Sequence, residues 1–220
     1  MFKSFTYSVA ILAVLASLDS SMALAQTPAG PASSASPVVR VRATIEKIDA
    51  SSITVKDRSG EIVTLVRAAD MPVNEVYPIQ LADIKPGSYV GTAAMPQPDG
   101  SQVALEVLVF PEAARGSNEG HYPWDLQPQS TMTNATEADL SAAPSTVPGG
   151  QKMTLKYKDG EKVVIVPESA PVVTFKPASA DDQKVLLVPG ARVLINAQDK
   201  DGKPTALRMI VGRNGFAPPM

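Results

Sequence analysis

The chain has 220 residues, a formal net charge of −2 and no cysteine, and aromatic residues make up 5% of it. The near-neutral charge argues against a nucleic-acid binder, which usually carries a basic surface to neutralise phosphates, and the few aromatic residues argue against a row of base-stacking platforms. The lack of cysteine excludes disulfides, thiol redox chemistry and thiolate metal sites, so stability must come from buried apolar surface.

The first 25 residues have the features of a secretory signal peptide. Lys3 supplies a positive N-terminal region, residues 9–18 are apolar, and residues 23–25 read Ala-Leu-Ala, a cleavage site. The apolar run is too short to span a bilayer as a helix, which needs about 20 residues. We therefore expect export, cleavage before Gln26, a periplasmic or secreted protein, and no membrane span after cleavage.

Residues 26–37 lack apolar periodicity and are predicted to form a flexible leader. From residue 38 apolar and polar residues alternate, with Arg40 and Arg42 among the polar positions. This period of two predicts a strand with one face on a core and the arginine face in water. The runs "SITVKD" and "EIVTLVR" follow, and the turn between them ends at Gly60, which predicts a hairpin.

A short helical turn is expected next, because Leu81 and Ile84 have helical spacing and Pro86-Gly87 ends the pattern. Two further strands are predicted at "SYVGTAAMP" and "SQVALEVLVF", with a hairpin at Pro98-Asp99-Gly100 between them. Residues 38–111 therefore form one unit of three strands, a helical turn and two strands.

The same pattern occurs twice. "ITVKDRSGEIVTLV" begins at Ile53, and "MTLKYKDGEKVVIV" begins at Met153, about 100 residues later. Later turn glycines and the run "ALEVLV", matched by "ALRMIV", recur in the same order. We interpret residues 132–213 as a tandem second copy. Its first strand, at residues 132–140, alternates poorly and is predicted to be bulged or at an edge.

The predicted fold is all-β, with two tandem five-stranded OB-like small barrels, each carrying a short helical turn between strands three and four. One continuous sandwich is the alternative. The G-E hairpin, the K-P-G before strand four and the D-G before strand five resemble those of an uncharacterised family of exported bacterial OB-like domains. The resemblance covers about 70 residues of each repeat. It implies an OB-like fold but supplies no catalytic or ligand-binding residue.

Residues 112–131 form an inter-repeat segment that the duplication does not explain, and residues 214–220 form a C-terminal tail. The inter-repeat segment holds the only histidine, His121, and the only tryptophan, Trp124, beside Tyr122 and Asp125. Aromatic faces with a hydrogen-bonding group suit a sugar or peptide ligand, so these four residues are the candidate ligand contacts. The alternative is that Tyr122 and Trp124 pack in the seam between the two barrels.

The sequence contains no recognised motif of a metal or catalytic site. The sequence has one histidine, and the "DKDG" at Asp199 does not continue as a calcium loop. No G-x-S-x-G, H-E-x-x-H or phosphate-loop motif occurs.

We therefore expect an exported, non-catalytic binding or scaffold module without cofactor or metal, whose partner is a small molecule, a glycan or an envelope protein. The alternatives are a purely structural envelope protein, a metal-associated periplasmic protein and a hydrolase.

Overall fold

The computed structural model describes residues 36–142 and 150–219. The predicted signal peptide and residues 26–35 of the predicted leader lie outside these ranges. The described chain is mostly β-strand and contains one short α-helix, α1 (Ala180–Leu186), which confirms the all-β class. Within these ranges, no helix has the length and apolar character needed to cross a bilayer.

In the described ranges, fourteen strands and three 3₁₀ turns accompany α1. The strands are β1 (Val39–Ile48), β2 (Ser52–Asp57), β3 (Ile62–Arg67), β4 (Val73–Pro78), β5 (Tyr89–Pro96), β6 (Gln102–Ala104), β7 (Val107–Val109), β8 (Gly120–Pro123), β9 (Thr131–Ala142), β10 (Gln151–Tyr157), β11 (Gly160–Val166), β12 (Val172–Pro177), β13 (Arg192–Lys200) and β14 (Lys203–Gly212). The 3₁₀ turns are η1 (Leu81–Asp83), η2 (Glu112–Ala114) and η3 (Arg213–Gly215).

The strand pairings close two rings of five strands. In the first ring, β1 pairs with β2, β2 with β3, β3 with β14, β14 with β13, and β13 with β1. In the second ring, β9 pairs with β10, β10 with β11, β11 with β6, β6 with β5, and β5 with β9. Each ring has one parallel pairing, β3 with β14 or β6 with β11, and each of these two pairings extends over only two residue pairs.

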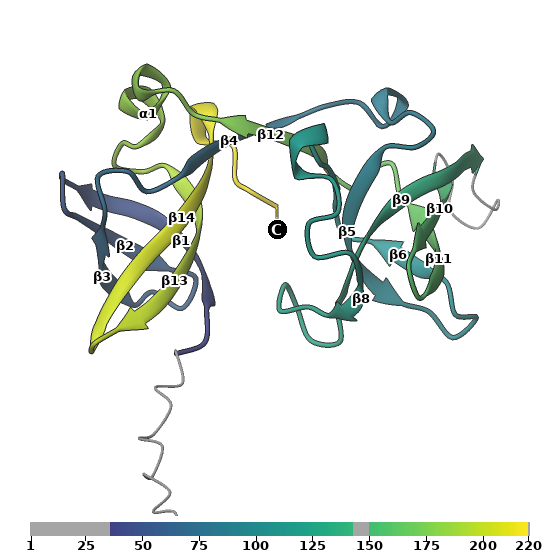
Figure 1. Ribbon diagram of the computed structural model, residues 1–220, viewed down its shortest axis with the longest axis horizontal. Coiled ribbons are helices and arrows are strands. Elements are labelled where there is room, and N and C mark those ends of the chain that lie inside the picture. The colour runs from purple at the N-terminus through teal and green to yellow at the C-terminus, as the bar shows by residue number, and fades with distance from the viewer. Residues whose placement is uncertain (1–35, 143–149, 220) are drawn as a thin grey trace, which may run out of the picture. The chain divides into compact units, whose positions relative to one another are not determined.

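Each ring takes three strands from one predicted repeat and two from the other. In Figure 1 the purple strands β1, β2 and β3 lie beside the yellow-green β13 and β14, while teal β5 and β6 lie beside green β10 and β11. This differs from the expectation that each repeat closes on itself. The repeat boundaries themselves stay a prediction.

The connectors β4 and β12 explain how each repeat supplies two strands to the ring of the other repeat. After its third strand, each repeat continues in an extended strand instead of turning back into its own ring. The two connectors pair antiparallel with each other, with Val76 opposite Phe175. Because both repeats have the same hydrophobic pattern, the fourth and fifth strands of either copy can complete a given ring.

Three clusters of buried apolar side chains form the core. One cluster fills the first ring and includes Ile45 and Ile195, and another fills the second ring and includes Met153 and Leu155. The third joins residues of β4, β7, β12, β13 and β14, among them Val76. The third cluster therefore packs β13 and β14 of the first ring against the connectors β4 and β12 and against β7, which pairs with β5 of the second ring.

The predicted turn glycines and helical turns are confirmed. Gly87 and Gly190 precede β5 and β13 with φ of +85° and +87°, in the left-handed region that glycine adopts at low cost. The predicted helical turn is η1 in the first repeat and α1 in the second, and Ser179 caps α1 by accepting a hydrogen bond from the backbone of Asp182.

Three strands, β4, β8 and β12, were not expected. The predicted strand at residues 101–110 is broken at Leu105 and Glu106 into β6 and β7. β9 has the expected register shift, but it pairs with β5, β8 and β10 and therefore does not lie at an edge.

Candidate functional site

The predicted contact residues come from the short strand β8 and the turn after it. β8 pairs with β9 so that His121 lies opposite Thr133 and Tyr122 opposite Met132. Successive residues of a strand point to opposite faces, so His121 and Tyr122 are separated by the sheet. His121 Nδ1 lies 2.8 Å from Thr133 Oγ1. Burial, with a smaller effect of the Lys162 charge, lowers the pKa of His121.

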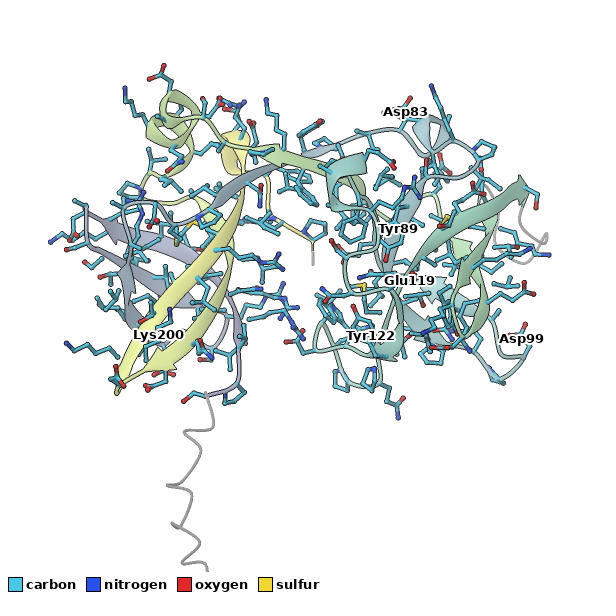
Figure 2. The ribbon with its side chains drawn as sticks, viewed as in Figure 1. Asp83, Tyr89, Asp99, Glu119, Tyr122 and Lys200 are labelled. Atoms are coloured by element: carbon cyan, nitrogen blue, oxygen red, sulfur yellow. The ribbon has the colours of Figure 1, made fainter. Side chains whose placement is uncertain are left out.

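Tyr122 and Trp124 lie together on the other face. Their ring centroids are 6.1 Å apart with an interplanar angle of 62°, an edge-to-face pair. The Tyr122 hydroxyl accepts a hydrogen bond from Asn134 Nδ2 at 3.1 Å, and the same amide donates to the Ser117 carbonyl at 3.1 Å. The Tyr122 side chain is thereby held on β9. Figure 2 shows Tyr122 in the same region as Tyr89 and Glu119.

Asp125 joins the inter-repeat segment, called the aromatic segment below, to strand β1 of the first ring. Its carboxylate accepts hydrogen bonds from Arg40 Nε at 3.1 Å and Arg42 Nη2 at 2.8 Å. Burial acts to raise the pKa of Asp125, but the hydrogen bonds from the two arginines hold it below its ordinary value. The Arg40 guanidinium also lies 3.9 Å from the centroid of the Trp124 ring, a cation–π contact.

The arginines of β1 were expected to face water, and that expectation is wrong. The Arg40 and Arg42 side chains are only 28% and 11% exposed, because the segment after β8 covers them. The sequence shows that Arg40 and Arg42 lie on one face of a strand. It does not show that this face is covered, because the covering residue, Asp125, comes from a distant part of the chain.

Two adjoining cavities surround Tyr122 and Trp124, with volumes of about 230 and 560 Å³. We call them together the aromatic cleft. The residues common to both are Asn118, Tyr122, Trp124, Arg208 and Ile210. The smaller cavity adds Phe110 and Phe175, whose rings meet edge-on at 6.1 Å.

Arg208 is the cation shared by both cavities of the cleft. It lies on β14 and is exposed. In the amide orientation that satisfies both groups, Asn196 Oδ1 accepts hydrogen bonds from Arg208 Nε and Nη2 at 2.9 and 3.1 Å. Among the described residues no carboxylate forms an ion pair with Arg208. The charge of Arg208 is therefore available to a ligand.

No protein-family model matches the chain, and comparison with curated proteins and with solved structures gives no significant match.

Glu106 is a buried carboxyl group that the sequence did not single out. It follows β6 at the break before β7, is 1% exposed, and neither carboxyl oxygen has a hydrogen-bond partner within the described ranges. Burial raises the pKa of Glu106 to about 8, and the Arg42 charge opposes this shift. In the sequence it occurs as one polar residue in the run "ALEVLV".

The four predicted contacts thus lie in three different places. Tyr122 and Trp124 line the aromatic cleft, Asp125 anchors the segment to Arg40 and Arg42, and His121 lies on the opposite face. Across residues 36–142 and 150–219, no group of three or more histidine or acidic side chains is placed to hold a metal ion.

Proposed function

We propose that the protein is an exported, non-catalytic binding module built from two OB-like small barrels. The five-strand rings support this fold, because an OB barrel is a partly open five-stranded barrel. The two-residue parallel pairing in each ring is such a weakly closed seam. The position of η1 and α1 between the third and fourth ring strands also supports it.

The aromatic cleft is the proposed ligand site. Ligand sites are usually mostly apolar cavities with a few placed polar groups. Tyr122, Trp124, Phe110 and Phe175 supply the apolar faces of the cleft, and Arg208 supplies a cation. The observation that carries the proposal is that Tyr122, Trp124 and Arg208 line both cavities. Aromatic faces bind the apolar side of a sugar, and a guanidinium binds a carboxylate, so the ligand is a glycan carrying a carboxylate.

A purely structural function is the second candidate. It is favoured by the contacts of Arg40 with Trp124 and of Asp125 with Arg40 and Arg42, which connect elements of the two rings. In that case the aromatic segment stabilises the contact between the rings and has no ligand.

Fluorescence of the single tryptophan tests the binding proposal. Trigalacturonate, an acidic sugar, is expected to change Trp124 emission, whereas neutral maltotriose changes it much less. Arg208→Gln is expected to remove the preference for the acidic sugar. Lys203→Gln, an exposed cation on the same strand, is the matched control and should retain the preference. Equal responses to both sugars, or no response, would reject the carboxylate-bearing ligand.

Trp124→Ala separates the two candidate functions. If Trp124 is a ligand platform, the variant loses sugar binding with little change in melting temperature. If Trp124 mainly packs between the rings, deleting it costs up to about 3–5 kcal/mol and lowers the melting temperature by several degrees. Sugar binding can then be followed by calorimetry, which does not depend on tryptophan.

A further inference from the structure

A further cavity, separate from the two of the aromatic cleft and of about 270 Å³, lies on the outer side of the first ring. We call it the cationic hollow. Its lining comes from β1, β2 and the turn after it, β13 and the C-terminal residues Ala217 and Pro218. The charged residues that line it are Arg42, Lys56, Arg58, Arg192 and Asp57. The aromatic cleft and this hollow share none of their lining residues.

Strand pairing sets the arrangement of the hollow. Thr44 of β1 lies opposite Lys56 of β2 on one side and opposite Arg192 of β13 on the other. Directly opposed residues are about 5 Å apart and point to the same face of a sheet. The Thr44 hydroxyl therefore lies between two cations whose Cα atoms are roughly 10 Å apart. Arg42, two residues before Thr44, projects from the same face.

The charges of the hollow are poorly balanced. Lys56, Arg58 and Arg192 are exposed, and in the described ranges none has a carboxylate within 4.0 Å. Asp57 is the one carboxylate of the lining, and its Oδ1 accepts hydrogen bonds from Ser59 and from the backbone of Glu61. Arg42 is already paired with Asp125. The three exposed cations Lys56, Arg58 and Arg192 thus face one carboxylate that the turn already holds, and a bound anion would reduce their mutual repulsion.

The second ring shows that strand pairing alone does not create this cluster. There Thr136 occupies the place of Thr44, with Lys156 opposite it on β10 and Tyr89 opposite it on β5. Tyr89, labelled in Figure 2, is 3% exposed and carries no positive charge. Asn134 corresponds to Arg42 by the same register. The excess of cations therefore belongs to the first ring.

We propose that the cationic hollow binds a phosphate-class oxyanion. Guanidinium groups pair with phosphate oxygens through two parallel hydrogen bonds, lysine adds a point charge, and a threonine hydroxyl donates one more hydrogen bond. Cations on both sides of Thr44 suit a group with several charged oxygens, more than a single carboxylate. The phosphate belongs either to a soluble phosphate compound or to the headgroup of an anionic lipid.

Titration of the full chain with inorganic pyrophosphate tests the site by calorimetry at low salt. The double variant Lys56→Gln/Arg192→Gln is expected to bind roughly tenfold or more weakly, since each charge-assisted hydrogen bond contributes that much. The matched control is Lys156→Gln, which removes the equivalent exposed lysine of the second ring. The Lys156→Gln control should bind pyrophosphate as tightly as the unaltered chain does. Added salt should weaken pyrophosphate binding to the control and to the unaltered chain.

Vesicles distinguish the two sources of phosphate. If the chain sediments with phosphatidylglycerol vesicles but not phosphatidylcholine vesicles, and pyrophosphate and the double substitution both prevent this, the ligand is a lipid headgroup. Pyrophosphate binding without vesicle binding indicates a soluble ligand. The proposal is overturned if neither probe binds, if the double variant retains binding, or if Lys156→Gln loses it equally. Unchanged circular dichroism of the variants establishes that binding, not folding, has changed.

Discussion

Ile45 in the first ring and Glu137 in the second ring occupy the same structural position. The Ile45 backbone donates to the Ala191 carbonyl at 2.9 Å and accepts from Gly190 at 2.8 Å. The Glu137 backbone donates to the Ser88 carbonyl at 2.8 Å and accepts from Gly87 at 3.1 Å. Both side chains are 1% exposed. The equivalence relates the first strand of each repeat to the fourth strand of the other repeat.

Engineered cysteines test this exchange, since the chain has no cysteine of its own. Val39 lies opposite Ala197 across the β1–β13 pair, at a separation that a disulfide can bridge. Val39→Cys/Ala197→Cys should therefore form an intramolecular disulfide on mild oxidation. Loss of free thiols in the monomer, measured by mass spectrometry, reports the bond.

The control places the second cysteine where an unexchanged repeat would need it. Ala94 is the β5 counterpart of Ala197, because it lies opposite Thr131 as Ala197 lies opposite Val39. Val39→Cys/Ala94→Cys should keep its thiols free within the monomer. The reverse result for the two pairs would show that each repeat closes on itself.

An ion-pair network joins the connector β4 to the C-terminal turn. Glu75 is 4% exposed and accepts hydrogen bonds from Arg213 Nε and Nη2 at 2.6 and 2.9 Å, while Arg213 Nη2 also donates to Asp182. We expect Glu75→Ala to lower the free energy of unfolding by about 1–3 kcal/mol, measured by urea denaturation. Breaking the exposed pair of Lys184 and Asp181 with Asp181→Asn should have little effect.

The same network predicts a loss of stability in acid. Hydrogen bonds from Arg213 lower the pKa of Glu75 below its ordinary 4.5, and hydrogen bonds from Ser179 and Arg213 lower the pKa of Asp182 to about 2. Groups with lowered pKa values stabilise the fold above their ordinary pKa and lose this effect as the pH falls. Glu75→Ala should therefore show a smaller decline in melting temperature between about pH 5 and pH 2. An equal decline in both proteins would contradict the prediction.

Local features of the fold could be predicted from the sequence. Gly60 and the alternating runs on either side predicted the β2–β3 hairpin, and the structure has Gly60 at φ +91° in that turn. Such features depend on neighbouring residues. The exchange between rings could not be predicted, because it depends on which of two similarly patterned strands meets β1.

The candidate site was predictable in part for the same reason. The single histidine and the single tryptophan drew attention to residues 112–131, and the structure places Trp124 of this segment beside Tyr122 in the aromatic cleft. His121 was grouped with them because β8 was not expected, and a strand sends adjacent residues to opposite faces. Arg40, Arg42 and Glu106 have ordinary positions in strand patterns, and only tertiary packing covers them.

The absence of a side chain at Gly91 leaves room for Asn134, whose amide holds Tyr122 in the aromatic cleft. A Cβ atom at this position would lie 2.5 Å from Asn134 Oδ1 and 2.9 Å from Phe110 Cε2. Gly91→Ala should therefore displace the amide that holds Tyr122 and cost about 1–3 kcal/mol, measured by thermal unfolding. In the double variant with Asn134→Ala, part of this cost should disappear, because the clash with Asn134 is removed while the close approach to Phe110 remains. Strictly additive effects would show that the contact with Asn134 is not responsible.

Glu106 gives a pH dependence of the opposite sign to that of Glu75. Its pKa is raised by burial to about 8, so the folded protein keeps the proton over a range in which the unfolded chain, with an ordinary pKa of 4.5, has lost it. Between these two values the unfolded state binds fewer protons than the folded state, so the free energy of unfolding falls as the pH rises. Above about pH 8 the effect levels off.

Glu106→Gln removes this titration while nearly preserving the shape of the side chain. The variant should gain stability relative to the unaltered chain as the pH rises from about 5 to 9, by an amount on the order of a few kcal/mol. Urea unfolding at several pH values measures the difference. Glu161→Gln, at an exposed position in the β10–β11 hairpin, should show no such trend. Because Arg42 attracts the ionised carboxylate, Arg42→Gln should raise the pKa of Glu106 further and extend the decline to higher pH. A pH-independent difference between Glu106→Gln and the unaltered chain would mean that Glu106 is ionised in the fold.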